Sequence, residues 1–172
     1  MINSFSKYLV TFLIYVLVIQ VMIINSINFG YYINPYIYIL FLIILPIEIS
    51  GWLLLILSFL TGLTIDMFQN CLGIHASVSV FLGVMRPLIL KSIAPRNGYE
   101  PGDLPIPSQH GFLWFFKYTV ICTIVHHLFL FFIESFSLNN LWAILLKTII
   151  SIVFTIVFIM LIRLFGVNKK RK

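Results

Sequence analysis

Ionisable residues are rare in this chain, and several of them lie within or beside long hydrophobic runs. In the stretch TGLTIDMFQNCLGIHASVSV, residues 61–80, Asp66 and His75 stand between apolar flanks. His126 and His127 are adjacent in another apolar run. Carboxylates and imidazoles serve acid–base catalysis and metal binding, and an ionisable group at the centre of a membrane costs about 2.5–3.5 kcal/mol. Their spacing therefore decides between a chemical and a structural role.

The spacing argues against an enzyme. A hydrolytic mechanism would recruit Asp66, His75, Glu134 and the histidine pair as acid–base groups. No serine, cysteine or carboxylate stands where it would form an evident nucleophile–base pair with them. The His-x-x-x-His motif of zinc hydrolases does not occur in the sequence. We therefore predict a protein that is not an enzyme and has no catalytic residues.

The histidine pair sits about halfway along its apolar run. Neighbouring residues on a helix point about 100° apart, so His126 and His127 cannot chelate one metal ion from one face, whereas His127 and Glu134 share a face. A haem or metal role would need a ligand from elsewhere, and interhelical hydrogen bonds are the simpler interpretation. Cys71 and Cys122 show no Cys-x-x-Cys or histidine spacing, so we predict no disulfide, metal site or cofactor.

Asp66 follows an apolar run at the expected C-terminal end of a helix, where a carboxylate opposes the helix dipole. Stabilisation of that helix therefore does not explain it. It is well placed to accept backbone N–H groups in the turn over residues 67–75. Gly62 permits close helix approach, and Gly73 permits a left-handed backbone conformation. We favour this structural role over a catalytic or ion-binding one, with His75 as a further structural or partner-interface candidate.

Four further charged residues are predicted to form two pairs, each within one leaflet. Glu48 falls at a proposed turn, and Arg86 falls near the same face of the membrane, so these two side chains are candidates for an ion pair. Lys147 and Glu134 share the opposite leaflet. The alternative for each pair is snorkelling, in which the charged heads reach water without a specific partner.

These groups must be positioned by a membrane domain. Of the 172 residues, 61% are hydrophobic and 9% are charged, far from the roughly 25% charged residues of soluble domains. The length fits one integral membrane domain, residues 1–172, of about six helices with about 20 apolar residues each. The apolar run at residues 8–24 is longer than the hydrophobic region of a signal peptide, so we interpret it as the first span.

We predict an all-α, polytopic membrane helix bundle of about six transmembrane helices. The second and third runs are the uncertain pair, because a single helix over residues 35–65 would be about 46 Å long, against a hydrocarbon core of about 30 Å. As two short elements they would be joined by a turn at residues 46–51, which gives six spans instead of five. The predicted spans are residues 8–24, 35–45, 51–65, 76–90, 116–133 and 141–165.

Loop charges predict the orientation of the spans. Three of the predicted loops contain no Lys or Arg, whereas both occur in the proline-rich loop 91–115 and in the tail 166–172. By the positive-inside rule these two segments are cytoplasmic. With six spans both termini then lie in the cytoplasm, whereas with five Lys7 and the N-terminus would lie outside. Four of the eleven Lys and Arg residues end the chain. The net charge of +6 therefore indicates an anchor for anionic lipid headgroups and not nucleic-acid binding.

The residues GLTIDMFQNCLGIHA, with Gly62, Asp66, Gly73 and His75, resemble the central motif of the bacterial rod-shape-determining protein MreD family. The resemblance implies a fold similar to the substrate-binding S components of energy-coupling-factor transporters. It also implies a multi-pass protein of the bacterial inner membrane that acts as a non-catalytic scaffold of the elongasome and supports peptidoglycan synthesis and regulation of cell shape. The implied partners are MreC, MreB, RodA, a class B penicillin-binding protein and membrane lipids.

Two features depart from that family, the proline-rich loop and the pair His126 and His127, and they leave the partner contacts open. One alternative is a true S component that captures a vitamin or a metal ion. S components typically present alanines four residues apart on their first helix to dock the energising subunit, but residues 8–24 contain no alanine or glycine. A haem-binding membrane anchor is a third class, and it would need histidines paired across helices.

Overall fold

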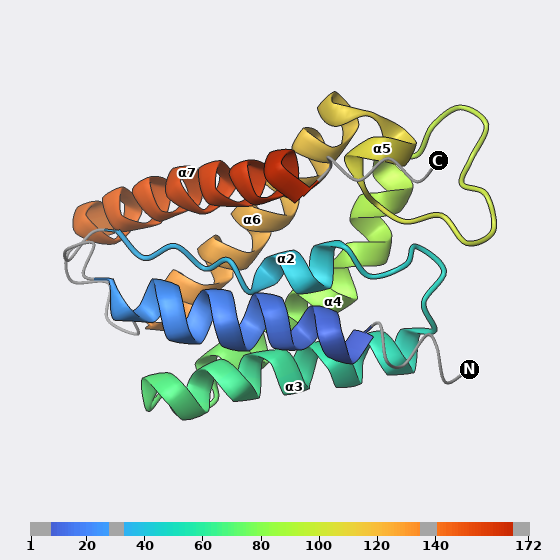
Figure 1. Ribbon diagram of the computed structural model, residues 1–172. Coiled ribbons are helices and arrows are strands. Elements are labelled where there is room, and N and C mark those ends of the chain that lie inside the picture. Colours follow the sequence, from blue (N-terminus) through green and yellow to red (C-terminus); the bar gives the residue numbers. More distant parts are fainter. Residues whose placement is uncertain (1–7, 28–32, 135–140, 167–172) are drawn as a thin grey trace.

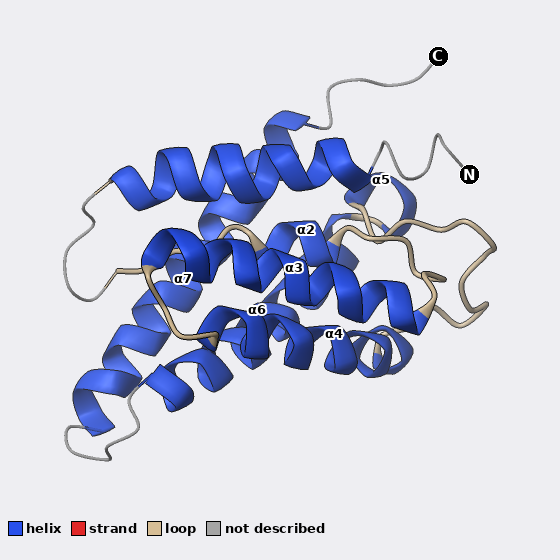
Figure 2. Ribbon diagram, turned by 90° about the horizontal axis from the view of Figure 1, so that it is seen from below, coloured by secondary structure: helices blue, strands red, loops and turns tan. Residues whose placement is uncertain are grey.

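The computed structural model describes residues 8–27, 33–134 and 141–166, and within these ranges the chain consists of helices and loops without strands (Figure 2). Five helices are long and apolar enough to cross a membrane. They are the first span Tyr8–Ser26, α3 (Gly51–Gln69), α4 (Ile74–Ser92), α6 (Phe112–Glu134) and α7 (Leu141–Gly166). The predicted all-α, multi-pass membrane bundle is therefore confirmed.

The lengths of these helices fit a bilayer. A helix of 19 residues, such as α3 or α4, is about 28 Å long, close to the hydrocarbon thickness of about 30 Å. The first span is a π-helix over η1 (Leu13–Ile23) and ends in the short 3-10 helix η2 (Ile24–Ser26). Each long helix exposes large apolar side chains along one side, as a lipid-facing helix must.

Residues 33–50, which we call the crossing segment, traverse the middle of the bundle a sixth time without forming a long helix (Figure 1). Their helical part is α2 (Ile39–Ile43), and the chain from Ile37 to Ile43 is almost completely buried. The turn predicted at residues 46–51 forms the end of this segment, and α3 begins at Gly51. The count of about six spans is close, since five crossings are helices and the sixth is this segment.

The crossing segment runs through the bundle because neighbouring side chains bind its free backbone groups. In a membrane every backbone N–H and C=O must find a partner inside the protein. Gln20 Oε1 accepts the N–H groups of Ile37 and Tyr38, at 2.6 and 3.2 Å. The Tyr36 N–H donates to Thr155 Oγ1 at 3.0 Å. A polar side chain on each of two long helices thus replaces the missing helical hydrogen bonds.

At the other end of the crossing segment the partner is Arg86, which is fully buried. Its Nη2 donates to the carbonyl oxygens of Leu45 and Pro46. Glu48 is exposed, and its carboxylate accepts a long bond of 3.4 Å from the Gly102 N–H. The predicted ion pair between Glu48 and Arg86 is therefore wrong, because the guanidinium group instead binds the carbonyls of Leu45 and Pro46.

The proline-rich connection is shorter than the predicted loop 91–115, because α4 extends to Ser92 and α6 begins at Phe112. It contains the single-turn helix α5 (Pro107–His110). The loop packs on the bundle through hydrogen bonds from Trp114 Nε1 to the Ile93 carbonyl and from Ile47 N–H to the Asp103 carbonyl, at 2.9 and 3.1 Å. We call this side of the molecule the loop end. The predicted basic tail lies almost wholly outside the described residues.

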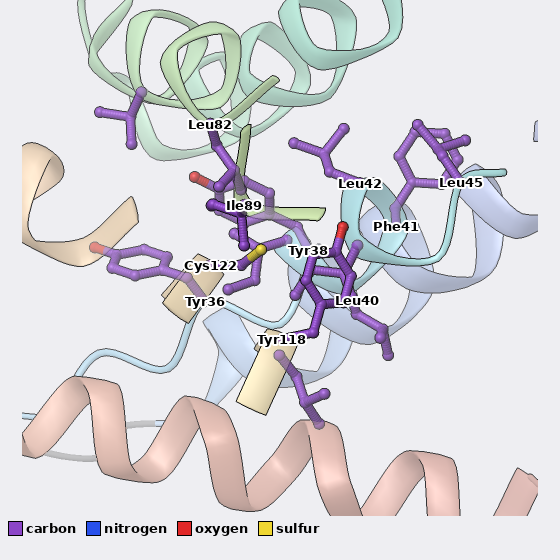
Figure 3. Close-up of a cluster of buried hydrophobic side chains, with 14 of the residues drawn as sticks. Tyr36, Tyr38, Leu40, Phe41, Leu42, Leu45, Leu82, Ile89, Tyr118 and Cys122 are labelled. Carbon is purple, nitrogen blue, oxygen red and sulfur yellow. The ribbon is translucent and has the colours of Figure 1, made fainter. Parts of the chain in front are cut away.

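The hydrophobic core surrounds the crossing segment. Side chains from this segment, from α4 and from α6 meet there, with the α7 ribbon beside them (Figure 3). Leu82 and Ile89 come from α4, and Tyr118 and Cys122 come from α6. The core is thus built around a mostly irregular segment with one short helix and not around a sixth long helix, and Tyr36 and Tyr38 are buried within it.

Candidate functional site

Asp66 closes the hairpin between α3 and α4, as the sequence predicts. Its two carboxylate oxygens accept the backbone N–H groups of His75 and Ala76, at 3.0 and 2.8 Å. Both donors belong to the first turn of α4, where N–H groups have no partner within the helix. The side chain is 3% exposed. Its negative charge therefore opposes the dipole of α3 but stabilises the N-terminus of α4.

The glycines of the motif have the roles that the sequence predicts for them. A Cβ atom on Gly62 would lie 2.2 Å from the carbonyl oxygen of His75, so the backbones of α3 and α4 touch at this point. Gly73 precedes α4 with a φ of 83°, in the left-handed region. Asn70 ends α3 with a φ of 54°. Two left-handed residues thus reverse the chain within a short turn.

His75 belongs to a mostly buried hydrogen-bonded chain that joins four elements: α3, α4, the crossing segment and α6. The hydroxyl of Tyr38 lies 2.6 Å from Nε2 of His126 and 3.2 Å from Nδ1 of His75. His75 Nε2 lies 2.9 Å from Oε1 of Gln69. The phenol has one proton, so one of the two histidines donates to its oxygen while the other accepts from it. The chain from Gln69 to His126 links the α3–α4 turn to α6 through the crossing segment.

His127 points to a different partner from its neighbour. Its two ring nitrogens lie 3.0 Å from the Thr123 carbonyl oxygen and 3.1 Å from Thr155 Oγ1 of α7. The ring of Tyr36 lies against both histidines, with centroid distances of 6.1 Å to His126 and 5.6 Å to His127. This arrangement agrees with the predicted interhelical hydrogen bonds, since the two imidazoles engage separate elements.

Several buried polar atoms near this chain have no hydrogen-bond partner among the described residues. His126 Nδ1 is one of them. Hydroxyls of the same kind on α4 and α6 belong to Ser79, Tyr118, Thr119 and Thr123. Buried polar groups of this kind are typical sites for internal water.

The predicted pair of Lys147 and Glu134 is confirmed. Lys147 Nζ lies 3.0 Å from Glu134 Oε1, and it also lies 4.7 Å from the centroid of the Phe131 ring. Glu134 is exposed at the end of α6, and Lys147 lies on α7. The pair therefore joins these two helices at the end of the bundle opposite the loop end.

The turn after Asp66 also brings together three potential metal ligands that sequence reasoning missed. One ligand atom each from Asp66, Cys71 and His75 lies within 4.8 Å of the others. Asp66 and His75 are buried, and Cys71 is half-buried. Burial, and then the charge of Asp66, raise the pKa of the Cys71 thiol. Cysteine spacing alone gave no sign of this cluster, because its three members belong to two helices and the turn between them.

A cavity of about 490 Å³ opens beside this turn. Its polar lining includes the amide side chains of Gln20, Asn25, Asn34 and Gln69. Gln20 and Gln69 were not predicted as site residues, although a lone glutamine in the otherwise apolar first span is a visible signal of a polar role. The cavity therefore adjoins the hydrogen-bonded chain through Gln69 and the crossing segment through Gln20.

Comparison with protein-family models, with curated proteins and with solved structures found no match to this chain.

Proposed function

We propose that the chain is a non-catalytic membrane scaffold of the bacterial cell-elongation machinery, similar to the MreD family. The observation that carries this proposal is that the residues of the MreD-like motif together build the hairpin between α3 and α4. Gly62 allows α3 and α4 to touch, Asp66 binds the first turn of α4, and Gly73 reverses the chain between them. Because these three residues all build one hairpin, their presence in the motif is explained by a structural role, and no catalytic role is needed to account for them.

The placement of the other polar residues supports the same proposal. Arg86 binds backbone carbonyls, and His127 binds a backbone carbonyl and Thr155. Tyr38 bridges His75 and His126. Each of these groups joins two elements of the bundle, so its burial is explained by internal cohesion. As a scaffold, the protein would work beside MreC, MreB, RodA and a class B penicillin-binding protein in the inner membrane.

The proposed orientation places the loop end in the cytoplasm, in keeping with its Lys91, Arg96 and Lys117. A single cysteine at Asn97, in a protein with Ser at positions 71 and 122, tests this. In intact cells Asn97→Cys should resist a membrane-impermeant maleimide and react after permeabilisation. Labelling of Asn97→Cys in intact cells would reverse the orientation.

The small-molecule S component is the second candidate, and the cavity of about 490 Å³ is the observation that favours it. Its amide-rich lining suits a neutral polar solute. The first span, however, lacks alanine and glycine. We therefore prefer the scaffold proposal. The two candidates differ in their expected binding partners, which are MreC for the scaffold and the ATPase subunits of a transporter for the S component.

Depletion of the protein in its own bacterium tests the scaffold proposal at the level of the cell. Rod-shaped cells should become round, and an intact copy should restore their shape. A Gly62→Leu copy should fail, because its side chain cannot fit against the backbone of α4. Rods that persist after complete depletion would contradict the proposal.

A further inference from the structure

The cluster of Asp66, Cys71 and His75 contains potential metal-binding groups that the hairpin does not need for its structure. The hairpin uses Asp66 as an acceptor and the left-handed residues Asn70 and Gly73 as a turn. The thiol of Cys71, in the middle of that turn, makes one weak hydrogen bond, to the Gln69 carbonyl oxygen at 3.7 Å, and lies beside a carboxylate and an imidazole. Thiolate, imidazole and carboxylate together are ligands typical of zinc and of other divalent transition metals.

We propose that the α3–α4 turn is a binding site for a divalent transition-metal ion of the zinc type. The thiolate of Cys71, Nε2 of His75 and an oxygen of Asp66 are its three ligands, and Oε1 of Gln69 is positioned for a fourth. The inference goes beyond the proposed scaffold function and does not depend on it, because the site lies within one hairpin of one chain.

The surroundings of His75 fit a metal ligand. A ligating histidine usually holds its second ring nitrogen on a hydrogen-bond partner, which fixes the tautomer and the orientation of the ring. Tyr38 occupies this position, 3.2 Å from Nδ1 of His75, and is itself held by His126 at 2.6 Å. The other nitrogen, Nε2, faces Gln69 Oε1 at 2.9 Å. A metal ion bound by both atoms would replace this hydrogen bond, and the two atoms would move slightly apart to admit it.

Asp66 can bind a metal ion without releasing α4. An ionised carboxylate has about four acceptor positions, and the N–H groups of His75 and Ala76 occupy two of them. The remaining positions are available to a cation. The ion would also offset the cost of holding this buried carboxylate charged.

The turn needs a modest contraction to form the site. The three ligand atoms now lie within 4.8 Å of one another, and a tetrahedral zinc site requires about 3.3–3.8 Å. Leu72, between Cys71 and Gly73, is fully exposed. The Leu72 side chain therefore does not oppose a movement of Cys71 toward the other two ligands. Binding would displace the thiol proton, so the metal ion and this proton exchange one for one at Cys71.

Cobalt(II) is the probe that tests the site, because a thiolate ligand gives it a charge-transfer absorption band. The full-length protein, purified in detergent with a histidine-free tag and a reductant, should bind one Co²⁺ with this band, and Zn²⁺ should displace it. Cys71→Ser should remove the band and weaken Co²⁺ binding by at least about tenfold. Cys122→Ser is the matched control, since Cys122 is buried in α6, and it should leave the band unchanged.

His75→Gln separates a true site from binding to the thiol alone. It should weaken Co²⁺ binding while the Cys71 thiol stays titratable. The proposal is overturned if the wild-type protein binds neither Co²⁺ nor Zn²⁺, or if Cys71→Ser binds Co²⁺ as the wild type does. A band that disappears with Cys122→Ser in place of Cys71→Ser would likewise overturn it. The readout is metal binding by the isolated protein, so it is independent of partner recovery and cell shape.

Discussion

The hydroxyl of Tyr38 lies 2.6 Å from Nε2 of His126, and this bond connects the crossing segment to α6 at the centre of the bundle. Both side chains are fully buried. The bond matters because the crossing segment is mostly not helical and cannot hold itself together by its own backbone. Removing the hydroxyl would leave two histidine nitrogens without a partner.

We expect Tyr38→Phe to destabilise the protein by about 1–3 kcal/mol, the usual cost of unsatisfied buried polar groups. A lower midpoint of thermal unfolding in detergent would measure this loss. Tyr36→Phe is the matched control, because within the described residues no hydrogen bond reaches the Tyr36 hydroxyl, and its ring contacts with the histidines would remain. Equal stabilities of the two variants would show that the Tyr38 bonds contribute nothing.

Substitution of Asp66 should produce a graded effect. Both oxygens accept backbone N–H groups, so Asp66→Ala loses two bonds and the charge at the start of α4, a cost of about 1–3 kcal/mol. Asp66→Asn keeps one acceptor and turns an NH₂ group toward the other N–H, so we expect a smaller loss. Thermal unfolding of the three proteins ranks them. If the Asn variant were less stable than the Ala variant, this would contradict the proposed role of Asp66 as an acceptor for the first N–H groups of α4.

Gly62→Ala should be among the most damaging small substitutions in the chain. The added Cβ would meet backbone atoms of His75 and Ala76, which cannot move without separating α3 from α4. Overpacking of this kind costs about 1–3 kcal/mol or more. Gly51→Ala, with no atom within 4 Å of its added Cβ, is the control and should fold normally. The yield of monodisperse protein in detergent compares the two, and equal yields would refute close helix contact.

Arg86 and Glu48 should behave as independent residues. Glu48→Gln should change stability little, because its bond to Gly102 is long and exposed. Arg86→Met should be strongly destabilising, since it removes the arginine bond to the buried Leu45 carbonyl and leaves the Pro46 carbonyl with only a long bond of 3.4 Å from the Ile49 N–H. Exchange of the two charges should therefore not restore stability. Recovery in a Glu48→Arg, Arg86→Glu double variant would show an ion pair after all.

Sequence reasoning succeeded where a residue acts on its near neighbours along the chain. Asp66, Gly62 and Gly73 lie within one hairpin, so the helix ends and the turn between them were enough to predict their roles. Lys147 and Glu134 were likewise predictable, because two consecutive helices must meet beside their connection.

It failed where the partner is a backbone group in an irregular segment. The sequence pairs Arg86 with Glu48, an opposite charge in the same leaflet, because the carbonyls of Leu45 and Pro46 become available to a side chain only where residues 33–50 leave the helical conformation. Gln20 was overlooked for the same reason, since it binds the N–H groups of that segment. Such roles depend on contacts between distant parts of the chain and not on local pattern.

The proteins that accompany this chain in the membrane test the central claim most directly. The tagged protein would be purified from its own bacterium in mild detergent, and co-purifying proteins would be identified by mass spectrometry. We expect MreC to be recovered with the wild type and to be reduced with Asp66→Ala at matched abundance. Recovery of the ATPase subunits of a transporter without MreC would contradict the scaffold and favour the S component.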